Sequence, residues 1–127
     1  MFSLSQRSIQ NLSGINMDLR RIVDRAIQIT KIDFGIPETG GWRDSEMQNW
    51  LFKSGKSMCD GYEKLSNHQK GEAVDFFAYV DGKASWEPEH LAQVACAFLQ
   101  AANELGIKLK WGGLFNSFID MPHVELA

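Results

Sequence analysis

The chain has 127 residues, of which 44% are hydrophobic and 23% are charged, and its formal net charge is −3. This length suits one domain with a single buried core, and no apolar run approaches the ~20 residues that cross a membrane. The slightly acidic balance provides no broad positive field for nucleic acid. We therefore predict a single domain over residues 1–127 that neither inserts into membranes nor binds nucleic acid.

Two features of the sequence bear on its compartment. Residues 1–7 lack the basic start and apolar core of a secretory signal, so we expect the protein to accumulate in the cytoplasm. The two cysteines, Cys59 and Cys96, lie far apart, and Cys96 falls on the apolar face of an expected helix. We expect both to be free thiols.

The first third of the chain predicts one helix and one strand. Residues 1–15 are polar with scattered apolar anchors and predict no defined element. Apolar residues then recur at helical spacing over Leu19–Ile27, behind a candidate cap at Asn16, which predicts an amphipathic helix. The alternation from Ile32 to Ile36 predicts a short strand that stops at Pro37.

A glycine-rich turn then leads Arg43 to the start of a second helix. Met47, Trp50 and Leu51 share a face of this helix, and Gly55 ends the pattern. Arg43 thus stands where a strand region passes into a helix, a position from which a side chain reaches a ligand. An ordinary surface arginine fits this position equally well.

Residues 73–80 are apolar on both faces except at Asp75, which predicts a central strand ended by the Asp81-Gly82 turn. An ionised carboxylate buried without a partner costs several kcal/mol. Asp75 must therefore be neutralised by a cation, hydrogen-bonded, or placed at the edge of a cavity.

The last third of the chain predicts a helix between strands. Apolar spacing predicts a long helix over Pro88–Leu105 that packs on the sheet, with His90 in its first turn facing solvent. Residues 107–111 alternate as a strand, and residues 122–126 form a short strand. Strand geometry places His123 on the opposite side of this last strand from its core-facing residues.

Three side chains of the types that bind zinc stand at His68, Asp75 and His123. The loop with His68 leads into the strand with Asp75, and a neighbouring strand would present His123 on the same side. Catalytic zinc takes three such ligands at about 2.0–2.2 Å and keeps an open position for water. Structural zinc sites, the alternative, are usually closed by four protein ligands that include Cys.

Asp120 precedes His123 by three residues, and Pro122 between them disfavours a helix. The pair therefore lies on a turn that leads into a strand. From this turn the Asp120 carboxylate reaches a water molecule at the open metal position without being a ligand. The pattern favours a zinc hydrolase.

Two paired segments resemble the zinc-binding motifs of the D-alanyl-D-alanine carboxypeptidase family of peptidases. They read Ser66-x-His68-x-x-Gly71-x-Ala73-x-Asp75 and Asp120-x-x-His123-x-Glu125. The resemblance is strongest to the phage and bacterial L-alanyl-D-glutamate endopeptidase branch, whose members cut the peptide stems of peptidoglycan. It extends to Arg43 with Gln48 and to Trp111-Gly112-Gly113, and it covers most of the chain from about Leu19 onward.

The resemblance implies an α+β fold in which helices pack against a small antiparallel β-sheet, with the zinc site on the open face. It implies one Zn²⁺ held by the two histidines and Asp75, with Asp120 as the general base. Arg43 would hold a substrate oxygen, either the developing oxyanion or a stem-peptide carboxylate. Three further polar residues would orient a ligand or contact the substrate: Gln48, Ser66 and Glu125.

The function implied is a zinc-dependent peptidoglycan peptidase that hydrolyses the L-Ala-D-Glu bond as a phage-type lysis enzyme. We expect a monomer without a separate wall-binding domain, held in the host cytoplasm until release. A D-Ala-D-Ala carboxypeptidase or dipeptidase and a non-catalytic zinc-containing binding module stay open as alternatives. The sequence departs from the family pattern at Asp44, where Thr is usual, and at Leu114-Phe115, where Asp-Trp is frequent.

Overall fold

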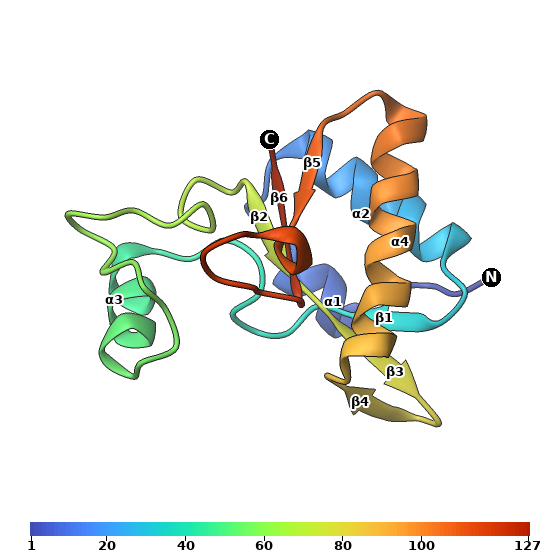
Figure 1. Cartoon of the computed structure of the whole chain (residues 1–127), viewed down its shortest axis with the longest axis horizontal. Coiled ribbons are helices and arrows are strands. Elements are labelled where there is room, and N and C mark those ends of the chain that lie inside the picture. Colours follow the sequence, from blue (N-terminus) through green and yellow to red (C-terminus); the bar gives the residue numbers. More distant parts are fainter.

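The computed structural model describes all 127 residues and contains four α-helices and two three-stranded antiparallel sheets (Figure 1). The helices are α1 (Gln6–Asn11), α2 (Met17–Ile29), α3 (Ser45–Lys53) and α4 (Pro88–Leu105). The strands and one 3-10 helix are β1 (Asp33–Gly35), β2 (Ala73–Asp75), β3 (Phe77–Val80), β4 (Lys83–Ser85), β5 (Leu109–Trp111), η1 (Gly112–Leu114) and β6 (His123–Leu126). The predicted α+β class is confirmed.

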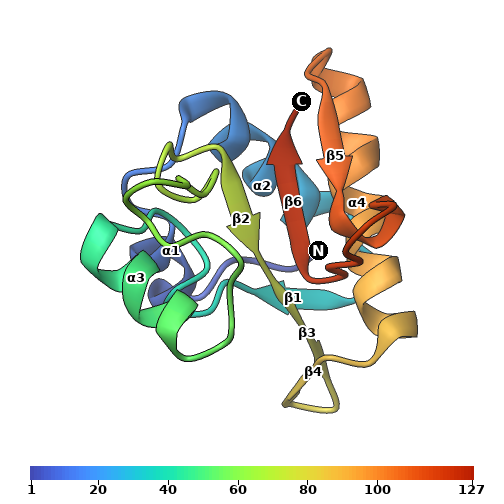
Figure 2. The ribbon, with the colours of Figure 1, turned by 60° about the vertical axis from the view of Figure 1, so that its left-hand side comes forward.

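The segment expected to be one central strand, residues 73–80, is divided between the two sheets. The strand orders are β1-β3-β4 and β2-β6-β5. Of the two parts of this segment, β2 is therefore an edge strand and β3 is the central strand of its sheet. Figure 2 shows β2 running directly into β3. The segment changes sheets because its neighbouring strand, β6, begins at His123. The last hydrogen bond on this side runs from the Phe76 N–H to the Pro122 carbonyl, at 2.8 Å, just before the first residue of β6. Beyond that point β6 offers no further partners, and β3 pairs with β1 and β4 instead.

The core lies between the sheets and the two long helices. A single cluster of 19 buried apolar residues joins α2 and α4 to β1, β2, β3 and β6. Phe98 of α4 packs on Phe34 and Phe76, with ring centroids 5.1 and 5.0 Å apart. Burying aromatic rings of this size is a major source of stability. The predicted packing of the long helix on the sheet is confirmed.

The predicted ends of the two long helices are confirmed. Asn16 Oδ1 accepts the Asp18 N–H at 2.8 Å at the start of α2. Gly106 ends α4 in the left-handed conformation, with φ 70°. The predicted turn at Asp81 and Gly82 is also present, with φ 53° and 76°, and it closes the β3–β4 hairpin.

One α-helix and one β-strand were not predicted. α1 has a single buried residue, Ser8, and so carries no apolar periodicity. β4 is largely exposed and has no buried face to produce an alternating pattern. No helix of the protein has the length and apolar character required to cross a bilayer.

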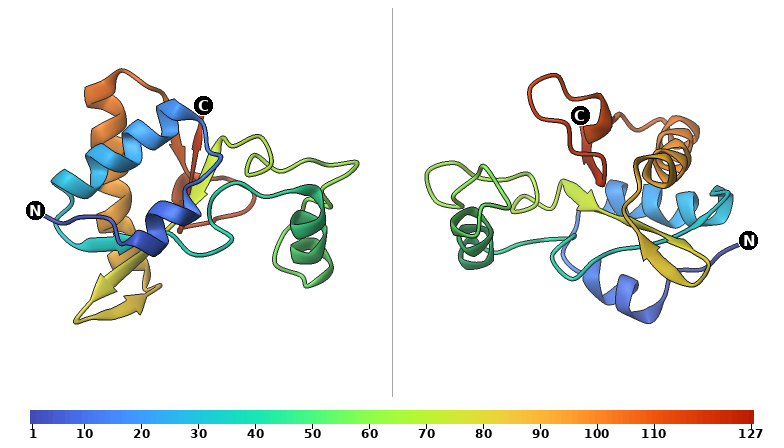
Figure 3. Two further views of the ribbon diagram at one scale, coloured as in Figure 1. Left: turned by 180° about the vertical axis from the view of Figure 1, so that it is seen from behind. Right: turned by 60° about the horizontal axis from the view of Figure 1, so that its bottom comes forward.

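The apolar face predicted for α3 is buried only at Leu51. Met47 and Trp50 are 39% and 55% exposed, whereas Gln48 is fully buried alongside Leu51. Figures 1 and 3 show why: α3 stands apart from α2 and α4, and the loop that follows it curls back over it. The polar Gln48 is therefore buried against a loop rather than against the apolar core.

Two smaller expectations also need correction. Cys96, expected on the apolar face of α4, is exposed, although both cysteines are free as predicted. His90, expected to face solvent, is half-buried, with its Nδ1 atom 2.7 Å from Ser85 Oγ. β4, which supplies Ser85, had no signal in the sequence.

Candidate metal centre

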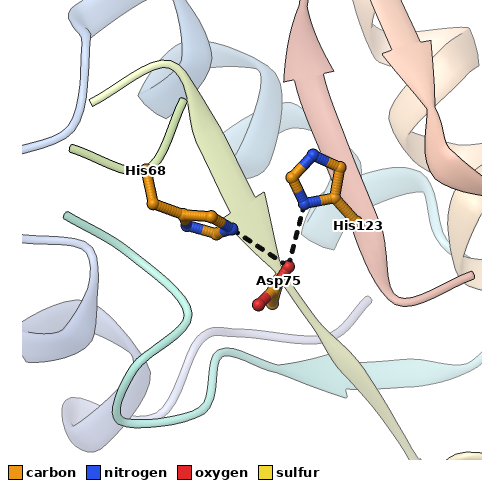
Figure 4. Close-up of side chains that lie close together, drawn as sticks. All are labelled: His68, Asp75 and His123. Atoms are coloured by element: carbon orange, nitrogen blue, oxygen red, sulfur yellow. Dashed lines mark hydrogen bonds and ion pairs between the residues drawn. The ribbon is translucent and has the colours of Figure 1, made fainter. Parts of the chain in front are cut away.

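His68, Asp75 and His123 meet at one place, as their spacing predicts (Figure 4). His68 lies in the turn before β2, Asp75 ends β2, and His123 begins β6 directly opposite Asp75 in the ladder. Their candidate ligand atoms all lie within 4.8 Å of one another. Asp75 Oδ1 is 3.3 Å from His68 Nε2 and 3.1 Å from His123 Nδ1.

The Asp75 carboxylate is ionised and held from two sides. Its Oδ2 atom accepts a hydrogen bond from Arg43 Nη2 at 2.9 Å, while Oδ1 faces the two histidines. Burial acts to raise the pKa of Asp75, but the charges and hydrogen bonds of His68 and His123 outweigh it and hold the pKa below its usual range. The carboxylate is thus hydrogen-bonded at the edge of a cavity, two of the environments expected for it.

Hydrogen bonds on the far side of each ring fix which nitrogen faces the cluster. His68 Nδ1 lies 3.0 Å from the Gly41 carbonyl, and His123 Nε2 lies 2.8 Å from Glu125 Oε1. Both partners only accept, so these nitrogens carry the hydrogens. When neutral, each ring therefore turns a lone pair toward Asp75, as in metal sites where the outer nitrogen of the imidazole is hydrogen-bonded.

The donor set fits a cation. Two imidazole lone pairs and a carboxylate oxygen cannot converge stably unless a proton or a metal ion lies between them. Although burial disfavours the charged imidazole, the hydrogen bond and charge of Asp75, with the hydrogen bond to Glu125, raise the pKa of His123 to about 9. Two His nitrogens and one carboxylate are also a ligand set of catalytic zinc sites. The group could therefore hold a metal ion.

A close backbone approach places the Gly41 carbonyl beside His68. A Cβ atom on Gly41 would lie only 2.1 Å from the Asn11 carbonyl at the end of α1. The neighbouring Gly40 carbonyl accepts the Asp75 N–H at 2.8 Å. Gly41 therefore lets this segment pass close to α1 while the segment supports His68 and Asp75, so α1, which the sequence did not reveal, helps to build the site.

Arg43 is not an ordinary surface residue, because its side chain is only 9% exposed. Nε donates to the Thr39 carbonyl at 2.8 Å and Nη1 to Gln48 Oε1 at 3.1 Å, in addition to the bond to Asp75. Burial lowers the pKa of Arg43, and Asp75 opposes this shift. The guanidinium therefore orients the Asp75 carboxylate through the hydrogen bond to Oδ2.

The three supporting residues expected from the motifs all lie close to the cluster. Gln48 connects Arg43 to the next loop by donating from Nε2 to Ser57 Oγ at 2.8 Å and to the Cys59 carbonyl at 2.9 Å. Ser66 Oγ accepts the His68 N–H at 3.0 Å and so fixes the turn that carries this ligand.

Glu125 and its partner Asn67 orient His123 from the outer side. Glu125 accepts from His123 through Oε1 and from Asn67 Nδ2 through Oε2, at 2.8 and 2.9 Å. The resemblance predicted that Glu125 orients a ligand or contacts the substrate, whereas sequence reasoning missed Asn67. Asn67 adjoins His68 in the chain, but its partner is 58 residues away, so no local pattern marks it.

Asp120 stands beside the cluster without belonging to it. Its Oδ2 atom lies 3.9 Å from His123 Nδ1, and burial, followed by the charge of Asp75, raises the pKa of Asp120. The Asp120 N–H donates to the Gly112 carbonyl at 2.9 Å, and a Cβ on Gly112 would lie 2.0 Å from the Asp120 carbonyl. The glycine after Trp111 therefore permits the approach that positions Asp120.

The side chains at the centre of the candidate site line one cavity of about 310 Å³. Its polar lining includes the metal group, which is His68, Asp75 and His123, together with Arg43, Asp120 and Glu125. Its apolar lining includes Met58, Leu65 and Phe118. Most of the lining is polar, and this convergence of polar groups in one cavity indicates a ligand or substrate site.

The two departures from the family pattern have visible structural places. Asp44 caps α3, because its Oδ1 atom accepts the Met47 N–H at 2.7 Å. The Phe115 ring meets His123 edge-on with centroids 5.9 Å apart, while Leu114 is 73% exposed. Neither departure removes a residue of the metal group.

Comparison with known proteins gives concordant results. The whole chain, residues 1–127, matches the family described as phage L-alanyl-D-glutamate peptidase. It is 32% identical over 117 residues to the L-alanyl-D-glutamate peptidase of Escherichia phage T5, an alignment that covers 91% of this chain and 83% of the relative. It is similar to the crystal structure of Serratia marcescens L-Ala D-Glu endopeptidase ChiX, with a TM-score of 0.86, 34% identity and coverage of 98% and 90% of the two chains.

The α+β fold is similar to that of an L-Ala D-Glu endopeptidase, and one cavity holds a His-Asp-His group beside a separate carboxylate. The protein is therefore a peptidase. Within this class, the chain belongs to the phage L-alanyl-D-glutamate peptidase family. The resemblance read from the paired motifs is confirmed.

Proposed function

We propose that this protein is a zinc-dependent endopeptidase that cuts the L-Ala-D-Glu bond in the stem peptide of peptidoglycan. The names of the phage T5 relative and of Serratia ChiX support this bond as the substrate. The observation that carries the proposal is the convergence of His68 Nε2, His123 Nδ1 and Asp75 Oδ1 within 4.8 Å, beside the Asp120 carboxylate.

His68, Asp75 and His123 are the residues that would hold a single Zn²⁺. When bound, zinc acts as a Lewis acid that polarises a carbonyl oxygen and lowers the pKa of water toward about 7. The protein prepares this site before binding, because Gly41, Glu125 and Arg43 each hold one ligand in its binding orientation. Such outer hydrogen bonds fix the tautomer and orientation of the ligands.

Asp120 is proposed as the general base. Its carboxylate faces the cavity and would accept a proton from the attacking water, then return it to the leaving amine. The raised pKa of Asp120 strengthens it as a proton acceptor and makes its protonated form accessible for the second step. A positioned acid–base group of this kind contributes about 10²–10⁴-fold in rate.

Arg43 would act first as a positioning residue. Each guanidinium nitrogen already donates to a protein acceptor, although a guanidinium has about five N–H donors in all. A donor left on Nη1 or Nη2 can stabilise the oxyanion that develops on the scissile carbonyl. We favour this role over capture of a substrate carboxylate, because Arg43 already neutralises Asp75.

The proposed setting is the lysis of a bacterial host. The relationship to the phage T5 enzyme supports synthesis in the host cytoplasm followed by release to the wall. We propose that the protein acts as a monomer, because one chain supplies every residue of the candidate site.

The direct test is digestion of purified peptidoglycan by the zinc-loaded protein, with mass spectrometry of the released fragments. New D-Glu amino termini and free L-Ala carboxyl termini are expected. Release of D-Ala alone would identify a D-Ala-D-Ala carboxypeptidase instead. Intact stems in the presence of stoichiometric zinc would favour a binding module.

A further inference from the structure

Two basic side chains line the cavity, Arg43 and Lys56, and only one of them is already engaged. Arg43 donates to protein acceptors from every guanidinium nitrogen. Lys56 takes part in no ion pair. Its Nζ atom lies 5.4 Å from the centre of the Trp50 ring, a contact that is weak where the ring is exposed. The Lys56 ammonium is therefore free to bind an anion.

The backbone of Lys56 is held by the end of α3. Its N–H donates to the Leu51 carbonyl at 2.9 Å, and the Gly55 N–H donates to the Phe52 carbonyl at 3.0 Å. This is the Schellman pattern, and Gly55 takes the required positive φ of 78°. The lysine thus leaves the helix at a defined point, and only its flexible four-carbon stem is free to move.

A chain of three hydrogen bonds connects this point to the metal group. Ser57, the residue after Lys56, accepts from Gln48 Nε2, and Gln48 Oε1 accepts from Arg43, which in turn binds Asp75. Gln48 is fully buried, so the middle of this connection is shielded from water. The backbone at Lys56 is therefore held at a defined position relative to the metal group.

The proposed substrate offers an anion that suits this cation. A D-glutamyl residue uses one of its two carboxyl groups to continue the peptide and keeps the other as a free carboxylate, a few bonds from the scissile nitrogen. Met58, Leu65 and Phe118 line the same cavity and are at least half exposed, so a bound peptide would cover them and displace water near the charge pair, which strengthens that pair. Lysine serves as a point-charge partner for such a carboxylate.

We propose that Lys56 binds the free carboxylate of the D-glutamyl residue, a specificity subsite that rests on the proposed function. The protein then prefers stems with a free carboxylate over stems in which this group is amidated. Arg43 keeps Asp75 in place and Lys56 selects the substrate, so the two cations of the cavity have separate tasks.

The test uses two synthetic stem peptides that differ only in whether the D-Glu carboxyl is free or a carboxamide. The wild-type protein is expected to cleave the free acid with kcat/KM about ten- to hundredfold higher, the range for a charged hydrogen bond. Lys56→Met is expected to raise KM for the acid to that of the amide with little change in kcat, because the contact binds ground state and transition state alike. Lys56→Arg is expected to keep the preference.

Lys53→Met is the matched control, since Lys53 is exposed on the last turn of α3 and does not line the cavity. It should behave as the wild-type protein does. Equal cleavage of both peptides by the wild-type protein, or an undiminished preference in Lys56→Met, would overturn the subsite alone. Failure of the zinc-loaded wild-type protein to cleave either peptide would overturn the proposed function itself.

Discussion

Glu125 and His123 lie two residues apart on the same face of β6, and Glu125 Oε1 holds His123 Nε2 at 2.8 Å. Asn67 donates to the other carboxylate oxygen, so Glu125 cannot turn away. The ring of His123 is therefore fixed with Nδ1 toward Asp75 before any metal arrives. A residue outside the His-Asp-His group thus orients one of its members.

Removal of this support should weaken metal binding. Glu125→Ala is expected to lower zinc affinity about 10–100-fold, the usual effect of losing a partner of a ligating histidine. Glu125→Gln keeps an acceptor oxygen and should lose much less. Competition with a chromophoric chelator measures both variants, and an unchanged affinity in Glu125→Ala would show that the hydrogen bond does not orient His123.

Metal binding and proton transfer should separate at Asp120. Asp120→Ala is expected to keep zinc but to lose about 10²–10⁴-fold in kcat, because the proton acceptor is gone while the ligands remain. His68→Ala should lose zinc and hydrolysis together. Metal analysis with a turnover assay on both purified variants distinguishes these outcomes, and full activity in Asp120→Ala would exclude it as the base.

Arg43 should contribute to folding as well as to catalysis. Arg43→Met leaves Asp75 without its permanently charged partner and is expected to cost about 3 kcal/mol, the lower end for breaking a buried pair, since the Asp75 side chain is 21% exposed. Urea unfolding of metal-free protein gives the value. Arg20→Met is the control, because the exposed Arg20–Asp24 pair should contribute about 0.5 kcal/mol or less. Equal losses would show that the buried pair has no special weight.

Zinc binding should release a proton near neutral pH. The pKa of about 9 means that His123 is protonated at pH 7 in the metal-free protein, whereas a metal needs the Nδ1 lone pair. Zinc affinity is therefore expected to rise about tenfold per pH unit between pH 7 and 8. Calorimetry in buffers of different ionisation enthalpy counts the protons, and binding without proton release would contradict the assignment.

The raised pKa of His123 also makes the stability of the metal-free protein depend on pH. A histidine pKa raised from 6.5 to about 9 stabilises the fold fully below pH 6.5 and loses this contribution as the pH rises through about 9. Metal-free protein should therefore lose stability across this range. The lowered pKa of Asp75 acts in the opposite direction, and its contribution is lost only as the solution becomes strongly acidic.

The convergence of His68, Asp75 and His123 was predictable because their patterns are local. His68 and Asp75 lie on one short segment, in the turn before β2 and at the end of β2. Strand alternation alone places the His123 side chain on the face of β6 away from the core-facing Val124. Asp120 followed from Pro122, which excluded a helix. These inferences needed only spacing, backbone geometry and the ligand preferences of zinc.

The supporting contacts were not predictable in the same way. Asn67 and Glu125 are joined across 58 residues, and Gly41 supports His68 only because α1 runs past it. Gln48 was assigned by resemblance, whereas apolar spacing pointed to Met47 and Trp50 as the buried face of α3. Periodicity assumes an apolar core, and α3 packs its polar residue against a loop.

The most direct measurement of the central claim is zinc K-edge X-ray absorption on the purified, zinc-loaded protein. We expect one zinc per chain, with only nitrogen and oxygen neighbours at about 2.0–2.2 Å and an imidazole signal from two histidines. A sulfur neighbour at about 2.3 Å, which Cys59 in the cavity wall could supply, or a zinc content well below one per chain, would contradict a site built from His68, Asp75 and His123.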